Sequence, residues 1–226
     1  MKRPALWFAG AAALLLGAVV LSPLGLRQMA FFQVRRVELV GTRYLAPEQL
    51  VARLGLAPDQ NLFDDAGEIA RRVERVGGVV SARVERRLPG TLRITVVERV
   101  PVAFAPGPNG LVPLDPTGRA LPYDPAATGL ALPLVPRADS LVLGALAQVR
   151  AADSALYQDV DAAERGEAGA VLLELGPRRV MLRGIPTIDE VQAVAAVRRH
   201  LAATGRPYAE LDARFEGWVV ARRSGS

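Results

Sequence analysis

The hydrophobic pattern of the chain opens on a long run without charge. From Pro4 to Leu26 no residue is charged, and a helix over this run would be roughly 34 Å long, enough to cross the hydrocarbon core of a bilayer. Trp7 lies near one end of the run, where interfacial aromatic side chains are common. A removed signal peptide would end at small residues such as Ala-x-Ala, and none follow here. The pattern therefore predicts an uncleaved transmembrane helix at 5–26.

The charges around this helix do not orient it, because basic residues stand on both sides. The length of the following chain is more informative, since long domains are exported largely regardless of charge. We therefore expect a cytoplasmic tail at 1–4, a juxtamembrane linker at 27–33, periplasmic domains from residue 34 onward and a short tail at 223–226.

Residues 34–102 show a pattern that predicts one α+β domain. Two short segments have apolar residues at helical spacing, and the second begins at Asp65, a good N-cap, and stops at Gly77-Gly78. Apolar and polar residues alternate on both sides of Pro89-Gly90, which predicts a hairpin. Two helices would then cover one face of a three-stranded sheet. The predicted elements are a strand at 34–40, helices at 47–54 and 65–76, and strands at 82–88 and 92–97.

Residues 103–222 predict a second, mixed α/β domain with less regular connections. Asp115-Pro-Thr-Gly118 is a turn signal between two short apolar segments, and Thr187-x-x-Glu190 is a capping box. Residues 122–138 are rich in proline and predict an irregular connection. The expected elements are a hairpin around 115–118, a helix at 139–156, a hairpin of 170–175 and 179–183, a helix over 187–201, and one or two strands over 211–222.

Composition excludes several kinds of chemistry. The chain has no cysteine, which rules out disulfides, thiolate zinc sites and a cysteine nucleophile. Its one histidine, His200, lies near a helix end, where it complements the helix dipole. The net charge is +5, but Lys2 and Arg3 precede the membrane helix, and 28 basic residues minus these two leaves 26 against 23 acidic ones. Since no aromatic-rich basic patch stands out, nucleic-acid binding is not expected.

Carboxylates are the remaining candidates for chemistry. Asp159-x-Asp161-x-x-Glu164 resembles a calcium loop but lacks the glycine at the sixth position, so a solvated acidic loop is expected. The patterns of a nucleophile elbow, a dinucleotide fold and a phosphate loop are all missing from the sequence. We therefore expect no catalytic residue, no metal, no cofactor and no small-molecule substrate. A wall hydrolase that uses only two carboxylates is the enzymatic alternative.

Several segments resemble one family. The ending Glu98-Arg99-x-Pro101-Val-Ala103 is similar to that of the FtsQ/DivIB family of bacterial cell-division proteins. The segments that resemble a POTRA domain are 37–41, 61–63, 82–92 and 96–103. The resemblance implies a POTRA domain at 34–102, a β domain at 103–222, and a single-pass inner-membrane protein that acts at the septum as a non-enzymatic scaffold of the divisome. The alternative is a polypeptide-transport module, which should bind unfolded peptides broadly.

The C-terminal segment is the candidate binding site. An edge strand over 211–222 would leave amides and carbonyls free to pair with a partner strand. Arginine and aromatic residues dominate interface energetics. The expected contact residues are Arg214, Phe215, Gly217, Trp218 and Val219. The resemblance implies that this edge docks FtsB in complex with FtsL, and the POTRA domain offers a second surface for other division proteins.

Two expectations follow for this site. Phe215→Ala, or a charge reversal at Arg214, should abolish binding of the exported FtsB segment and leave the thermal melt unchanged. The competing interpretation places Phe215 and Val219 in the core, where they would contribute packing and no partner contact.

Overall fold

The computed structural model describes residues 32–56, 60–63 and 65–223. The transmembrane helix predicted at 5–26 therefore lies outside the described residues, as do the cytoplasmic tail and most of the linker. Within the described part, no helix is both long and apolar enough to cross a bilayer. The chain forms two compact units that divide between Glu98 and Arg99, slightly before the boundary predicted at residue 102.

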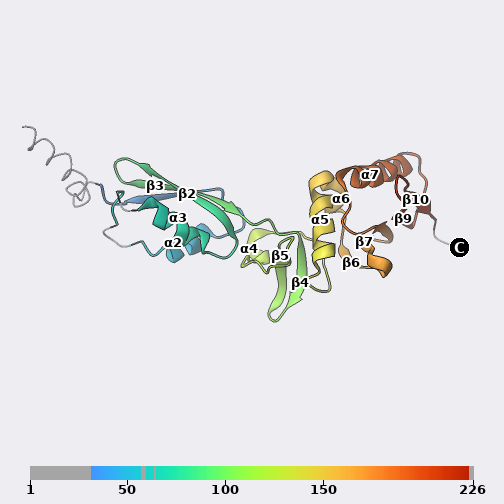
Figure 1. Ribbon diagram of the computed structural model, residues 1–226, viewed down its shortest axis with the longest axis horizontal. Coiled ribbons are helices and arrows are strands. Elements are labelled where there is room, and N and C mark those ends of the chain that lie inside the picture. Colours follow the sequence, from blue (N-terminus) through green and yellow to red (C-terminus); the bar gives the residue numbers. More distant parts are fainter. Residues whose placement is uncertain (1–31, 57–59, 64, 224–226) are drawn as a thin grey trace, which may run out of the picture. The chain divides into compact units, whose positions relative to one another are not determined.

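The first unit has the predicted order of strand, helix, helix, strand and strand (Figure 1). Its sheet has the order β1-β3-β2, with β3 parallel to β1 and antiparallel to β2. Both helices lie on the same side of the sheet (Figure 1). The elements are β1 (Arg36–Val40), α2 (Pro47–Leu54), α3 (Ala66–Glu74), β2 (Val79–Arg87) and β3 (Thr91–Glu98).

Local signals account for the helices of this unit. Pro47 begins α2, and Gly55 ends it with a left-handed φ of 55°. The Asp65 carboxylate accepts a hydrogen bond from the Gly67 N–H at 2.8 Å and caps α3. Ile69 and Val73 of α3 are buried, as every second residue of β3 is, so the helix stripe and the strand face form one core.

Glu98, the last residue of β3, holds a loop of the first unit in place. Its side chain is 9% exposed and accepts the backbone N–H groups of three consecutive residues. The distances are 2.9 Å from Arg43, 2.8 Å from Tyr44 and 2.9 Å from Leu45. The glutamate of the Glu98-Arg99-x-Pro101 sequence therefore anchors the segment that leads into α2.

The second unit is a mixed α/β fold around a long sheet. Two adjacent strands open it, and helices and a five-stranded sheet follow. The elements are β4 (Ala103–Gly107), β5 (Gly110–Leu114), α4 (Pro125–Thr128), α5 (Ser140–Ala152), α6 (Ser154–Gln158), β6 (Ala162–Arg165), the short 3₁₀ helix η2 (Glu167–Gly169), β7 (Val171–Leu175), β8 (Arg178–Leu182), α7 (Ile188–Ala203), β9 (Glu210–Ala213) and β10 (Val220–Arg222).

Two predicted elements of this unit were placed incorrectly. The first hairpin joins β4 and β5 through a two-residue turn, and the hairpin predicted around 115–118 is reduced to a bridge between Leu114 and Ala120. The helix predicted at 139–156 is broken at Asp153, whose backbone is extended. The Asp153 carboxylate accepts the Leu156 N–H at 2.8 Å, so this residue starts a new helix and does not continue the old one.

The acidic segment 159–164 is also more ordered than a solvated loop. It runs into strand β6, which pairs with β7. The Asp159 carboxylate pairs with Arg198, and the Asp161 carboxylate accepts the Gly176 N–H at 2.6 Å. Strand β6 is stabilised by its pairing with β7. Its own sequence therefore shows too little apolar alternation to predict a strand.

The five-stranded sheet has the order β10-β9-β8-β7-β6, and only β8 and β9 within it are parallel. Helices α5 and α7 contribute to the same apolar core as the alternate residues of β7 and β8. Beyond β6, Leu134 continues the sheet: its N–H donates to the Asp161 carbonyl at 2.9 Å, and its carbonyl accepts from the Ala163 N–H at 2.8 Å. Leu134 is also bridged to Phe104 of β4. In the described part of the chain, β10 is thus an edge strand, whereas the β6 edge is covered.

The start of α5 carries a prediction about acid stability. Asp139 accepts the Leu141 N–H at 3.0 Å and the Val142 N–H at 3.4 Å, and its two oxygens bind Arg165 Nε at 2.7 Å and Nη2 at 2.6 Å. The hydrogen bonds from Arg165 are the largest cause that lowers the Asp139 pKa from 3.8 to about 2. A folded-state pKa below the unfolded one stabilises the fold above about pH 4, and this stabilisation is lost as the pH falls toward 2.

We expect Asp139→Asn to lower the free energy of unfolding by about 1–2 kcal/mol at pH 7, because asparagine still caps the helix but cannot pair with Arg165. The difference from the wild type should shrink between pH 4 and pH 2, as measured by denaturant unfolding at several pH values. Asp124→Asn is the matched control, since Asp124 caps α4 and has no ion pair among the described residues. Equal pH profiles for the Asp139 variant and the wild type would contradict the prediction.

Candidate partner-binding site

The C-terminal edge of the second unit is formed by β9, a turn and β10. The two strands are antiparallel, with Val220 opposite Asp212 and Arg222 opposite Glu210. Strand β9 lies between β8 and β10, so residues 210–213 cannot accept a further strand. The edge predicted over 211–222 is therefore narrower than expected, and only β10, all of whose residues are exposed, is open to pairing.

The five predicted contact residues, 214 to 219 without 216, lie together in the turn that links the strands. The Phe215 side chain is 52% exposed and that of Trp218 is 75% exposed. The Trp218 N–H donates to the Phe215 carbonyl at 3.1 Å, and Gly217 has a left-handed φ of 74° that suits this tight turn. The turn thus presents two aromatic side chains to solvent beside the open strand.

Of the two residues that the competing interpretation placed in the core, only one packs there. Phe215 is exposed, so this interpretation is wrong for it. Val219 is half-buried and packs against the apolar core of the unit. Val219 therefore lies on the core side of the turn, and Phe215 and Trp218 form its solvent-exposed side.

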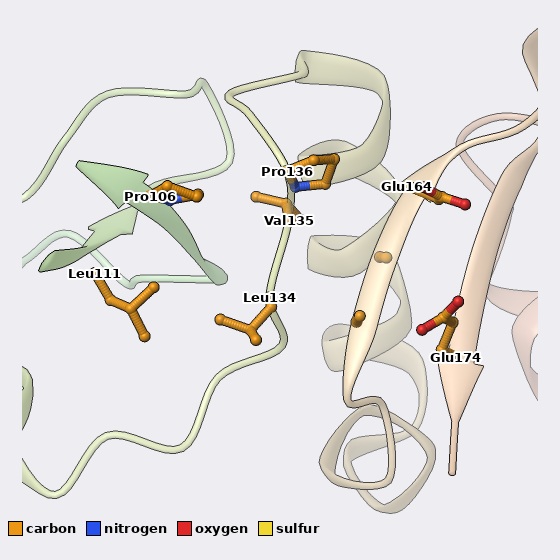
Figure 2. Close-up of a pocket in the computed structure, with 9 residues that line it drawn as sticks. Pro106, Leu111, Leu134, Val135, Pro136, Glu164 and Glu174 are labelled. Carbon is orange, nitrogen blue, oxygen red and sulfur yellow. The ribbon is translucent and has the colours of Figure 1, made fainter. Parts of the chain in front are cut away.

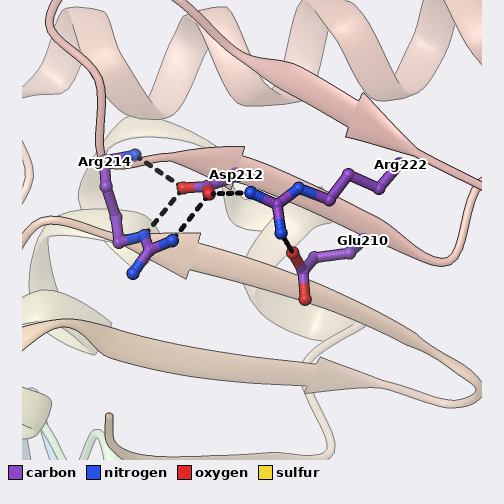
Figure 3. Close-up of polar contacts among 4 residues, drawn as sticks. All are labelled: Glu210, Asp212, Arg214 and Arg222. Carbon is purple, nitrogen blue, oxygen red and sulfur yellow. Dashed lines mark hydrogen bonds and ion pairs between the residues drawn. The ribbon is translucent and has the colours of Figure 1, made fainter. Parts of the chain in front are cut away.

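Arg214 has a partner within its own strand pair. Asp212 is fully buried, and its carboxylate accepts the Arg214 Nε at 2.9 Å and Nη2 at 2.8 Å, as well as the Arg214 backbone N–H at 3.2 Å (Figure 3). Arg222 Nη2 donates to the same carboxylate at 3.1 Å, and Arg222 Nη1 lies 3.4 Å from Glu210 Oε1 (Figure 3). Two guanidinium groups therefore cover one buried carboxylate and connect β9, the turn and β10.

The electrostatics follow from this pairing. The Arg214 hydrogen bonds are the largest cause that lowers the pKa of Asp212 below its ordinary value. Reciprocally, the hydrogen bonds to Asp212 raise the pKa of Arg214 above its ordinary value. Both groups are therefore charged at neutral pH. Loss of Asp212 would leave Arg214 without its carboxylate, whereas loss of Arg214 would leave Arg222 as the remaining arginine partner of Asp212 among the described residues.

This network changes the expectation for Arg214. A charge reversal there would place a second carboxylate against buried Asp212, so the stability of the unit should fall together with partner binding. The expected unchanged melt therefore applies to Phe215 and not to Arg214.

Sequence reasoning missed Glu210, Asp212 and Arg222. The signal for them was available in part: Glu210, Asp212 and Arg214 are spaced by two, which places them on one face of a strand. What the spacing could not show is that Arg222 returns on β10 to the same carboxylate, because this depends on the register of β9 against β10.

The other candidates for chemistry do not converge in the part of the chain that the structure describes. That part contains no group of three or more His, Asp or Glu side chains that could hold a metal ion. His200 lies in the last turn of α7 and is exposed, which fits its predicted role at a helix end.

Comparison with known proteins identifies the first unit. Residues 32–99 match the family model described as a POTRA domain of the FtsQ type. The fold defines a protein with one POTRA domain followed by a mixed α/β domain whose last strand is an edge. The first unit is therefore a POTRA domain of the FtsQ type, and the chain is similar to proteins named cell division protein FtsQ.

Relatives from three species carry the name Cell division protein FtsQ. The Cell division protein FtsQ of Mycobacteroides abscessus is 33% identical over 122 residues, which cover 52% of this chain and 39% of that protein. FtsQ of Mycobacterium tuberculosis strain H37Rv is 35% identical over 125 residues, or 48% of this chain and 40% of that protein. The chain thus spans less than half the length of these relatives. FtsQ of Corynebacterium glutamicum is matched more fully, over 81% of this chain and 87% of that protein, at 25% identity.

Proposed function

We propose that this protein is a non-enzymatic scaffold of the bacterial divisome, anchored in the inner membrane by the helix at 5–26 and concentrated at the septum. Its FtsQ-type POTRA domain and the names of its relatives support a role in cell division. The observation that carries the proposal is the open strand β10 with Phe215 and Trp218 exposed beside it. In this proposal the edge binds an FtsB-type partner that is complexed with an FtsL-type protein.

The physical basis of binding is strand addition. A partner strand that pairs with β10 satisfies backbone groups that otherwise face water, and its side chains supply specificity. Strand β10 has only three residues, so pairing contributes few hydrogen bonds, each worth about 0.5–1.5 kcal/mol net. The aromatic turn must therefore supply much of the affinity, which matches the enrichment of tryptophan and tyrosine among dominant interface residues.

The membrane helix would contribute through concentration. An anchor confines the exported domains to the same plane as other single-pass partners and so raises their effective concentration. A short, weak edge can then bind selectively without high intrinsic affinity. This mechanism needs no reactive group, which agrees with the composition of the chain.

The proposal is tested by imaging the chain in a dividing bacterium. A fluorescent fusion should concentrate at midcell before constriction, and a tagged FtsB-type partner should follow it there. With the double variant Phe215→Ala, Trp218→Ala, the partner should no longer be recruited. An even distribution around the envelope would reject the division role and favour the polypeptide-transport alternative.

A further inference from the structure

The second unit has an apolar pocket far along the sheet from β10. It has a volume of about 280 Å³ and lies where the β4–β5 hairpin and the segment 133–136 meet β6 and β7. In Figure 2, Leu111 and Leu134 line one side of it, and the carboxylates of Glu164 and Glu174 lie on the other. Leu111 is 48% exposed and Leu134 is 46% exposed, so two large aliphatic side chains face solvent at this point.

Strand alternation explains why the pocket is open. On β6 and β7 the residues Ala163 and Leu173 point into the core that α5 and α7 cover. Their neighbours therefore point to the opposite face, where Glu174 stands across from Ala162. The bridge from Leu134 to Ala162 extends this face toward β4, so that aliphatic and acidic side chains share one surface.

The carboxylates of Glu164 and Glu174 have no ion-pair partner among the described residues. In this unit the other acidic side chains commonly bind arginine: Asp139 pairs with Arg165, and Asp153 pairs with Arg199. Glu164 and Glu174 form neither an ion pair nor a side-chain hydrogen bond within the described residues. Arg179 stands across from Glu174 on β8, yet makes no ion pair with it. Glu164 and Glu174 therefore place negative charge at the edge of the pocket, although the net charge of the whole chain is +5.

We propose that this pocket is a second protein-docking site, which receives a partner segment with a bulky aliphatic residue next to an arginine or lysine. The aliphatic side chain enters between Leu111 and Leu134, and the basic side chain binds Glu164 and Glu174. The volume of about 280 Å³ is sufficient for an aliphatic side chain and lies at the lower end of the range for small-ligand pockets, about 300 to 1,000 Å³. Unpaired charge beside apolar surface supports a basic partner and not an acidic one. This inference does not depend on the site at β10.

The test uses the full-length chain in detergent micelles and a dye-labelled, acetylated peptide with two leucines followed by two arginines. Fluorescence anisotropy should show saturable binding that weakens at high salt. In the double variant Glu164→Arg, Glu174→Arg, affinity for this peptide should fall at least tenfold. The same variant should gain at least tenfold affinity for a second peptide in which glutamates replace the arginines. Adding Leu134→Ser should weaken the binding of the first peptide to the wild type and of the second peptide to the double variant.

Matched variants separate binding at this pocket from a general effect of net charge and from binding at the β10 edge. Glu85→Arg changes the net charge in the POTRA domain and should leave peptide binding unchanged, as should Trp218→Ala at the β10 edge. Thermal melts of all variants check that they fold. The proposal is overturned if neither peptide binds at millimolar concentration, or if both bind equally whatever the charge at 164 and 174. It is also overturned if the chain forms dimers that Leu134→Ser abolishes, as measured by sedimentation, because the occupant would then be a second copy.

Discussion

Replacing Trp218 or Phe215 by alanine should lower affinity for an FtsB-type partner at least tenfold and leave the thermal melt unchanged. The two side chains are 75% and 52% exposed, so their removal opens no core cavity. A central aromatic at an interface is commonly worth about 2 kcal/mol or more, and each 1.4 kcal/mol is tenfold in affinity. Titration calorimetry with the full-length chain in nanodiscs and the partner's exported segment would measure the affinity, and circular dichroism would measure the melt.

Two other variants of the same turn separate a loss of partner contact from a loss of stability. Glu216→Ala removes an exposed side chain without an ion pair in the described structure and should leave both affinity and melt as they were. Arg214→Glu should lower both, because it places a second carboxylate against Asp212, which is fully buried. Alanine variants of Phe215 and Trp218 that bind as well as the wild type would show that this turn is not the docking site.

Glu98→Ala should destabilise the POTRA domain strongly. The substitution removes the acceptor of three backbone N–H groups, from Arg43, Tyr44 and Leu45. An unsatisfied buried donor costs about 1–3 kcal/mol, so the loss should reach about 3 kcal/mol or more, a large share of the roughly 5–15 kcal/mol that stabilises a typical domain. For a domain of this size, the midpoint of thermal unfolding should fall by more than about 10 °C.

Hydrogen exchange distinguishes this mechanism from a general loss of packing. The amides of residues 43–45 should lose protection first in the Glu98→Ala protein, before those of the buried strand β3. Glu98→Gln keeps one acceptor oxygen and should cost less, whereas Glu85→Ala, on an exposed position of β2, should cost little. An unchanged melt for Glu98→Ala would mean that water replaces the carboxylate without loss.

The elements that sequence alone predicted well are those with local causes. Pro47 and Gly55 bound α2, Asp65 caps α3, and the capping box of Thr187 and Glu190 begins α7 at the expected place. In each case the signal and the contact lie within a few residues, so neighbouring chemistry is sufficient. The hairpins around 89–90 and 176–177 were equally local, because alternation and a turn residue specify both strands.

The parts of the sheet that the sequence did not predict depend on partners far along the chain. Strand β6 exists because β7 pairs with it, and Leu134 belongs to the sheet because Ala163 and Asp161 bond to its backbone. Neither β6 nor the segment around Leu134 shows a periodic apolar pattern, since the groups that stabilise each of them lie in other parts of the chain.

The sequence by itself determined the order of the POTRA elements and the absence of thiol chemistry, and it indicated Phe215 and Trp218 as contact candidates. Only the tertiary structure decided which strand edge is open, that Arg214 is held by buried Asp212, and that Glu164 and Glu174 border an apolar pocket. The physical reason is that side-chain alternation and capping act over a few residues, whereas strand order and register are set by pairing across the whole domain.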